Sequence, residues 1–170
     1  MAGKQDVVRA IRESQAEIER VARSLSEAAL AGGVYESGWN AKRLLCHLAA
    51  GGGFAAFMIG FAKAPAPPPA GFDQDRWNAH EVRSREGKSL AALLDELRAS
   101  SERSIAAVEA APDDLLASHF RAPWGIEGTL AEVIIESLRD HVGTHLAELR
   151  SALGQGAGRE APSEGGRRSK

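Results

Sequence analysis

The sequence lacks the features that mark several classes of protein. It has one cysteine, Cys46, among 170 residues, which excludes an internal disulfide and favours a reducing cytoplasm. Its formal net charge is -2, so there is no basic excess that would bind nucleic acid. The N-terminus, MAGKQDVVRA, has no apolar run of the kind found in a signal peptide. These absences predict a cytoplasmic protein without a nucleic-acid partner.

Long apolar runs are also scarce. The longest, residues 44–62, approaches the length of a membrane span, but it contains His47 and three successive glycines, and no second span follows it. We interpret it as a buried helix, because 44% apolar and 26% charged residues are typical of a soluble globular domain. We therefore expect no membrane partner.

Four long segments carry apolar residues at helical spacing, and none shows the alternation of a strand. The chain is predicted to be all-α, a four-helix bundle over residues 1–153 with a crossover connection between helices two and three. The crossover is APAPPPAG, residues 64–71, which cannot be helical because proline lacks the amide hydrogen. Residues 154–170 are glycine-rich and charged, which predicts a disordered tail. The long helices are expected at residues 5–30, 41–62, 89–110 and 130–153.

Several helix ends are marked by capping residues. Asn40 is placed to cap the second helix, and Asp73 to cap a short helix that precedes the third. Thr129 and Glu132 form a capping-box signature for the fourth helix. A turn-rich connection is expected just before it, at residues 117–128.

Two histidines lie one helical turn apart in the fourth helix. His141 and His145 continue the apolar stripe that begins at Leu130, at spacings of three and four, so both are expected to point inward. Their β-carbons should lie about 5 to 6 Å apart, which lets two ring nitrogens reach one ion. Two ligands are too few for a metal site, however, so a hydrogen-bonded core pair or a chance pairing stays open.

A third histidine, His47, falls on the apolar stripe of the second helix. Burying three imidazoles costs free energy unless each is hydrogen-bonded or coordinated, and bundle interiors commonly hold metals between facing helices. A shared ion would satisfy all three rings. His80 lies in the short polar helix and His119 in a loop, and we interpret both as exposed or pocket-rim groups.

The order of the motifs resembles a known superfamily. GWNAKRLLCHLA, the proline-rich crossover, FDQDRWNAHEVRSREGKSLAALLDELRAS, the APWG turn and TLAEVIIESLRDHVGTHLAELR are similar to the DinB-like (YfiT-like) four-helix-bundle proteins, which are related to mycothiol-dependent maleylpyruvate isomerase N-terminal domains. The resemblance runs from the first helix to Leu153. It implies a divalent metal, zinc or nickel, bound by His47, His141 and His145, and it is compatible with a homodimer.

Three nitrogen ligands would leave coordination positions open, as in a catalytic site. The resemblance implies activities that range from mycothiol-dependent isomerases and bacillithiol transferases to self-resistance hydrolases. We expect a metal-dependent enzyme that acts on a small electrophilic molecule, by thiol transfer or by hydrolysis, with a metal-bound thiolate or hydroxide as nucleophile. The alternative is a small-molecule binding protein that sequesters a natural product for self-protection without metal catalysis. No Ser-His-Asp elbow, phosphate loop or dinucleotide fingerprint is present.

The residues that would surround the ion suggest room for a substrate. Ser101, Ser104 and Ser137 fall on or beside inward stripes where large aliphatic side chains are expected, so the core is interpreted as incompletely filled. The three glycines at 51–53 fit either space for a substrate beside His47 or close helix packing, and both readings stay open.

Other candidates for the substrate site come from the loops and the fourth helix. Trp124, in the PWG turn, and Trp77 are candidates for the pocket rim, and Arg121 and Arg139 for contacts with an anionic group. Glu148 lies one turn beyond His145 and is a weak candidate for a catalytic base or a partner of that histidine, with a surface ion pair as the alternative. Asp140 is less favoured, because adjacent residues of a helix do not share a face.

Overall fold

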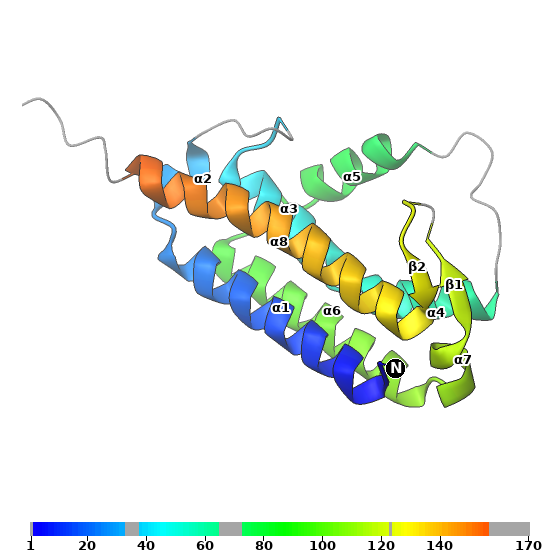
Figure 1. Cartoon of the computed structure of the whole chain (residues 1–170). Coiled ribbons are helices and arrows are strands. Elements are labelled where there is room, and N and C mark those ends of the chain that lie inside the picture. Colours follow the sequence, from blue (N-terminus) through cyan, green and yellow to red (C-terminus); the bar gives the residue numbers. More distant parts are fainter. Residues whose placement is uncertain (1, 33–37, 65–72, 123, 157–170) are drawn as a thin grey trace, which may run out of the picture.

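The computed structural model describes residues 2–32, 38–64, 73–122 and 124–156 (Figure 1). Within them, helices dominate and a small hairpin joins the last two helices. The elements are α1 Lys4–Ser24, α2 Glu27–Ala31, α3 Ala41–Gly51, α4 Phe54–Lys63, α5 Gln74–Arg83, α6 Leu90–Ala110, α7 Asp113–Ala117, β1 His119–Arg121, β2 Glu127–Thr129 and α8 Leu130–Gly156.

The bundle consists of α1, the pair α3 and α4, α6 and α8. In Figure 1, α1 and α8 lie side by side and run in the same direction, while α3, α4 and α6 run the opposite way. The α3 and α4 pair and α6 follow each other in the sequence and run in the same direction. This arrangement requires a crossover that returns the chain to the end of the bundle where α3 begins. Helix α5 makes this return and packs against α3. The predicted all-α four-helix bundle with a crossover is therefore confirmed, although most of the proline-rich segment, residues 65–72, lies outside the described residues.

The first predicted helix, residues 5–30, is wrong in its extent. Helix α1 ends at Ser24, and Leu25 takes an extended conformation with ψ of 130°. Ser24 donates its hydroxyl to the carbonyl of Val21, and Ser26 caps α2 by accepting from the amide of Ala29. Serine side chains compete in this way for backbone groups, which favours a helix end over a continuous helix.

The second predicted helix, residues 41–62, is also divided. Helices α3 and α4 are bent by 41° at their junction. A β-carbon on Gly52 would lie 2.9 Å from the β-carbon of Ser100, so glycine is needed here for close packing against α6. Ser104 donates to the carbonyl of Gly52 at 3.0 Å and accepts from the amide of Ala56 at 3.3 Å. The serine thus satisfies backbone groups that the bend removes from the helical ladder.

The start of α8 matches its predicted capping box. The amide of Glu132 donates to the hydroxyl of Thr129, and the amide of Thr129 donates to the Glu132 carboxylate. Asn40 and Asp73 likewise accept from the first-turn amides of α3 and α5. Helix α8 continues to Gly156 instead of ending at residue 153, and the rest of the predicted tail, residues 157–170, lies outside the described residues.

The connection before α8 contains two short strands that the sequence pattern did not indicate. Strands β1 and β2 pair antiparallel, with Phe120 opposite Gly128. Each strand has three residues, too few for alternating polarity to be recognised. The hairpin turns at Gly125, whose φ of 98° is a conformation that glycine adopts most readily.

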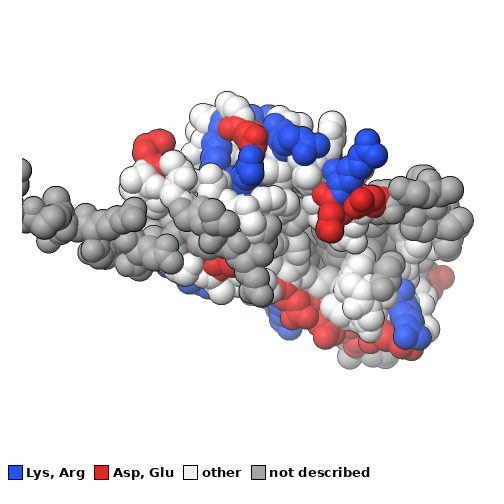
Figure 2. Space-filling view, turned by 90° about the horizontal axis from the view of Figure 1, so that it is seen from above, with Lys and Arg blue, Asp and Glu red and all other residues white. Residues whose placement is uncertain are grey.

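On the face seen in Figure 2, the described residues form no large area of one charge. Acidic and basic side chains lie there in small mixed groups between wide uncharged areas. Among the described residues, no single helix is long and apolar enough to cross a membrane. Helices α3 and α4 meet that test on length and composition only when they are taken together across their bend.

Candidate metal centre

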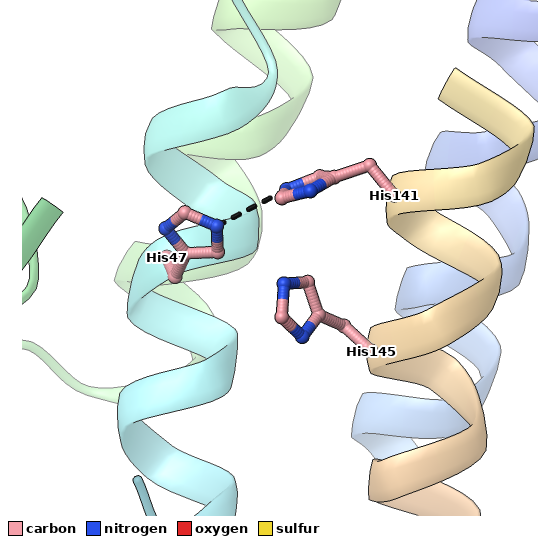
Figure 3. A group of neighbouring side chains, drawn as sticks. All are labelled: His47, His141 and His145. Atoms are coloured by element: carbon pink, nitrogen blue, oxygen red, sulfur yellow. Dashed lines mark hydrogen bonds between the residues drawn. The ribbon is translucent and has the colours of Figure 1, made fainter. Parts of the chain in front are cut away.

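Three imidazole rings meet between α3 and α8. His47 comes from α3, and His141 and His145 project from successive turns of α8 toward it (Figure 3). One potential ligand atom from each residue lies within 4.8 Å of the other two. The Nε2 atoms of His47 and His141 are 3.1 Å apart. The structure thus brings together the three histidines that the sequence singled out.

The rings lie at the edge of the core and not within it. In this part of α8 the buried positions are Val142, Leu146 and Leu149. His141 is exposed, and His47 and His145 are half-buried. The expectation that His141 and His145 point inward holds in part, because both project toward α3, but the buried stripe of α8 passes beside them and His141 is exposed.

Neighbouring side chains hold two of the rings. The ring of Trp39, just before α3, lies 5.1 Å from that of His47, centroid to centroid. Nδ1 of His145 lies 2.8 Å from Oε2 of Glu148. Since an ionised carboxylate can only accept, Nδ1 of His145 is the donor in this contact, and Nε2 is the ring atom left to bind an ion. The Glu148 side chain is only 17% exposed, which argues against an ordinary surface ion pair.

The surroundings of the rings favour their neutral form. Burial, followed by the effect of the nearby rings of His141 and His145, lowers the pKa of His47 to about 3. Burial, followed by the effect of His145, lowers the pKa of His141 to about 4, although part of this residue is exposed. Both rings are consequently neutral at neutral pH, which is the form that binds a metal.

The donor set fits a divalent ion. Zinc binds imidazole nitrogen at about 2.0 to 2.1 Å, so two ligands of a tetrahedral site lie about 3.3 Å apart. The 3.1 Å separation between the Nε2 atoms of His47 and His141 is close to this value. Glu148 lies behind His145, where carboxylate partners of metal-binding histidines are commonly found. Three imidazole nitrogens, one of them with a carboxylate behind its ring, suit zinc or nickel and would leave coordination positions open.

A cavity of about 500 Å³ adjoins this centre. His141 lines it, together with Gly51 and Gly52 at the bend of α3 and with Ser101 and Ser137 from α6 and α8. Ser101 and Ser137 border this space, as expected for an incompletely filled core, whereas Ser104 is fully buried and bonds the backbone at the bend of α3. For the glycines both readings hold, because Gly52 packs closely on α6 and also borders the cavity.

The structure separates the other candidate residues into two groups. Trp124 lines the cavity, and its Nε1 donates to the hydroxyl of Ser137 at 3.1 Å. Arg121 lies on β1 beside Glu127, Arg139 borders a separate groove between α1 and α8, and Trp77 is 55% exposed on α5. None of these last three is among the described residues that line the cavity.

Sequence reasoning missed several polar groups of the cavity. Gln15 of α1 and Gln74 and Asn78 of α5 line it. Asp140, which was less favoured from the sequence, also lines it beside His141. The spacing of four between Gln74 and Asn78 places both on one face of α5, which is a usable signal. The crossover sets the orientation of α5 and so turns this face toward the cavity. The local sequence contains no signal for that orientation.

The comparisons with known proteins give the family and the fold of the chain. The family model of the mycothiol maleylpyruvate isomerase N-terminal domain matches residues 11–150. The chain belongs to this family. No curated protein matches it in sequence.

Solved structures share the fold. The crystal structure of the mycothiol-dependent maleylpyruvate isomerase is similar at a TM-score of 0.64 and 17% identity, and so is that of a histidine-to-alanine mutant at 0.64 and 16%. The match covers 88% of this chain but 63% of the isomerase, so this family member spans less than two thirds of that enzyme. YfiT from Bacillus subtilis, described as a probable metal-dependent hydrolase with an unusual four-helix bundle topology, gives a TM-score of 0.65 at 18% identity. That match covers 89% of this chain and 87% of YfiT.

Proposed function

We propose that this protein is a metal-dependent enzyme that acts on a small electrophilic molecule, with His47, His141 and His145 as the ligands of zinc or nickel. The observation that carries the proposal is the position of His141, which belongs to the histidine cluster and also lines the cavity. A ligand of the ion would therefore stand at the wall of a space large enough for a substrate, since small-molecule pockets commonly measure about 300 to 1,000 Å³.

When bound, the ion would act as a Lewis acid, which would activate a thiol or a water molecule at neutral pH and polarise the electrophile. The protein's own residues prepare the site for it. Glu148 accepts from Nδ1 of His145 and so directs Nε2 toward the other two rings. Trp39 packs against His47 and restricts its ring. Trp124 and Ser137 close one wall of the cavity through their hydrogen bond.

Two reactions suit this arrangement, transfer of a low-molecular-weight thiol such as mycothiol and hydrolysis. The names of the similar proteins support both, because one is a mycothiol-dependent isomerase and the other a probable metal-dependent hydrolase. Of the two, we favour thiol transfer, and membership of a family whose model is named after a mycothiol-dependent isomerase supports this choice. The sequence also allowed a protein that binds and sequesters a small molecule without catalysis. The test below must exclude this alternative. The homodimer stays a prediction.

The test measures turnover by the untagged full-length protein reconstituted with zinc or with nickel. A panel of small electrophiles that includes maleylpyruvate is incubated with mycothiol and, separately, without any thiol. Several equivalents of product per protein, lost in His145→Ala and retained in His80→Ala, would support the enzyme. His80 is a suitable control because it lies on α5, outside the histidine cluster. Stoichiometric protection of the electrophile without product would show a binding protein instead.

A further inference from the structure

The cavity wall is mostly apolar and carries few charged groups. Most of its described lining is apolar, and the polar part consists almost entirely of uncharged hydroxyl and amide groups. The apolar side chains include Ile11, Ile18, Leu48, Phe54, Leu97 and Ile126. The uncharged polar ones are Ser14, Gln15, Gln74, Asn78, Ser101 and Ser137.

The charge balance of the lining is more informative. Asp140 is the single Asp, Glu, Lys or Arg among the described residues of the wall. Arg121 and Arg139, which the sequence suggested as anion-binding groups, lie elsewhere. Three of the segments outside the described residues, 33–37, 65–72 and position 123, contain no lysine or arginine. The lysine and arginine residues that lie outside the described parts all fall within 157–170. Among the described residues of the wall, an anionic ligand would therefore face one carboxylate, that of the exposed Asp140, and no lysine or arginine.

We infer that the cavity beside His141 receives an uncharged, mostly apolar part of the substrate and discriminates against small molecules that carry more than one anionic group. The inference rests on the proposed function and narrows its substrate class. A divalent ion at the histidines would balance one anionic group at that end. A second anion would lie against apolar walls and near Asp140, and a buried charge without a partner is strongly disfavoured. The hydroxyl and amide groups instead suit a ligand with carbonyl or hydroxyl functions.

The first experiment measures binding without metal, so that neither the ion nor turnover contributes. The full-length protein is stripped with a chelator and titrated calorimetrically at pH 7.5 with three compounds of one skeleton, methyl 2-naphthoate, 2-naphthamide and 2-naphthoate. The expected result is that the ester and the amide bind at least about tenfold more tightly than the carboxylate. Equal or tighter binding of the carboxylate would overturn the inference, and so would failure of all three to bind.

A designed pair of variants reverses the charge of the wall. Asn78 lines the cavity and is half-buried, so Asn78→Arg places a cation there, and Asn78→Gln is the matched change without charge. Asn78→Arg is expected to raise the affinity for 2-naphthoate about tenfold, with little change for the ester, whereas Asn78→Gln leaves the preference as in the parent. The inference is contradicted if both variants shift the three ligands alike. Should the arginine variant lose its fold by circular dichroism, Asp140→Asn replaces it, with an expected two- to fourfold gain for the carboxylate alone.

The outcomes separate this inference from the proposed function. Preference for the neutral ligands without any turnover would support the inferred selectivity of the cavity and count against the enzyme, because binding is measured on the metal-free protein. Turnover of a dianionic substrate such as maleylpyruvate, combined with tighter binding of the carboxylate, would refute the inference and leave the enzyme standing.

Discussion

The two halves of α8 differ in how they meet the rest of the bundle. Residues 130–138 are enclosed on several sides, and Leu130, Val133 and Ile134 are completely buried. In residues 139–150 the buried positions form a narrow stripe. The side facing α3 carries His141 and His145 (Figure 3), and Glu148 contacts the ring of His145. One continuous helix thus stabilises the core with its first half and positions polar groups with its second, where enclosure is incomplete and polar side chains cost less.

The largest effect should follow from removing a histidine of the second half. His141→Ala and His145→Ala are each expected to reduce bound zinc or nickel from about one equivalent to background, because two nitrogens hold such an ion weakly. The free energy of unfolding of the metal-free protein should change by less than about 1 kcal/mol, since neither ring is in the core. Elemental analysis of untagged protein and chemical denaturation measure the two quantities.

The control for this pair is His119→Ala, which removes an exposed histidine of β1 and should keep the metal. Metal retained in His141→Ala or His145→Ala, or an equal loss in His119→Ala, would contradict the assignment of ligands. A large loss of stability in the metal-free variants would instead remove the distinction between the two halves.

A matched valine in each half tests the packing side of the comparison. Val133 is completely buried, whereas Val142 is 8% exposed and borders the cavity. Val133→Ala is expected to lower the free energy of unfolding by about 2 to 3 kcal/mol and Val142→Ala by about 1 kcal/mol, because truncation beside an existing cavity loses fewer contacts. Urea denaturation at constant pH compares them. Equal losses would mean that the second half is as tightly packed as the first.

Glu148 offers a smaller and more specific effect. Glu148→Gln retains the size of the side chain but replaces the charged acceptor of the His145 Nδ1 proton. Metal affinity is expected to fall about tenfold, the lower end of the range for such partners. Competition with a chromogenic chelator measures it. Glu136→Gln, an exposed carboxylate in the first half of α8, is the control and should leave the affinity unchanged. A similar decrease of metal affinity in both variants would mean that Glu148 acts only through its negative charge and not through its contact with His145.

Much of the fold follows from local sequence signals, and the exceptions have a common cause. Asn40, Asp73 and Thr129 cap the helices as predicted, because a cap depends on residues within one turn. The bend at Gly52 depends on its approach to Ser100, forty-eight positions along the chain, and no local pattern contains that contact. The hairpin escaped prediction because its three-residue strands carry too little periodicity.

The candidate site shows the same division. His141 and His145 could be paired from their spacing alone, and their partner His47 from the apolar stripe of another helix and from the family resemblance. Their position at the edge of the core, and the polar wall that α5 adds with Asn78, result from how whole helices pack and from the crossover. The spacing of side chains along one helix is encoded locally, whereas the rotation of that helix about its axis is set by every element that it contacts.

The smallest expected effect concerns the start of α8. Thr129→Ala removes the hydroxyl that accepts from the amide of Glu132 and should cost about 1 kcal/mol of the free energy of unfolding. Thr144→Ala is the matched control in the second half. Its exposed hydroxyl donates to the carbonyl of Asp140, a bond that an interior helical residue does not need, so its loss should be nearly neutral. Thermal denaturation of the metal-free variants gives both values.

The metal affinity of the threonine variants tests whether the first half of α8 only stabilises the fold or also positions the histidines. If the first half serves only stability, Thr129→Ala binds the ion as tightly as the parent, because the cap lies about three turns from His141 and its effect ends within the first turn of α8. A loss of affinity that accompanies the loss of stability would show that the position of the histidine pair depends on the anchoring of the whole helix. The two halves would then form one mechanical unit, and core packing would itself determine the geometry of the metal centre.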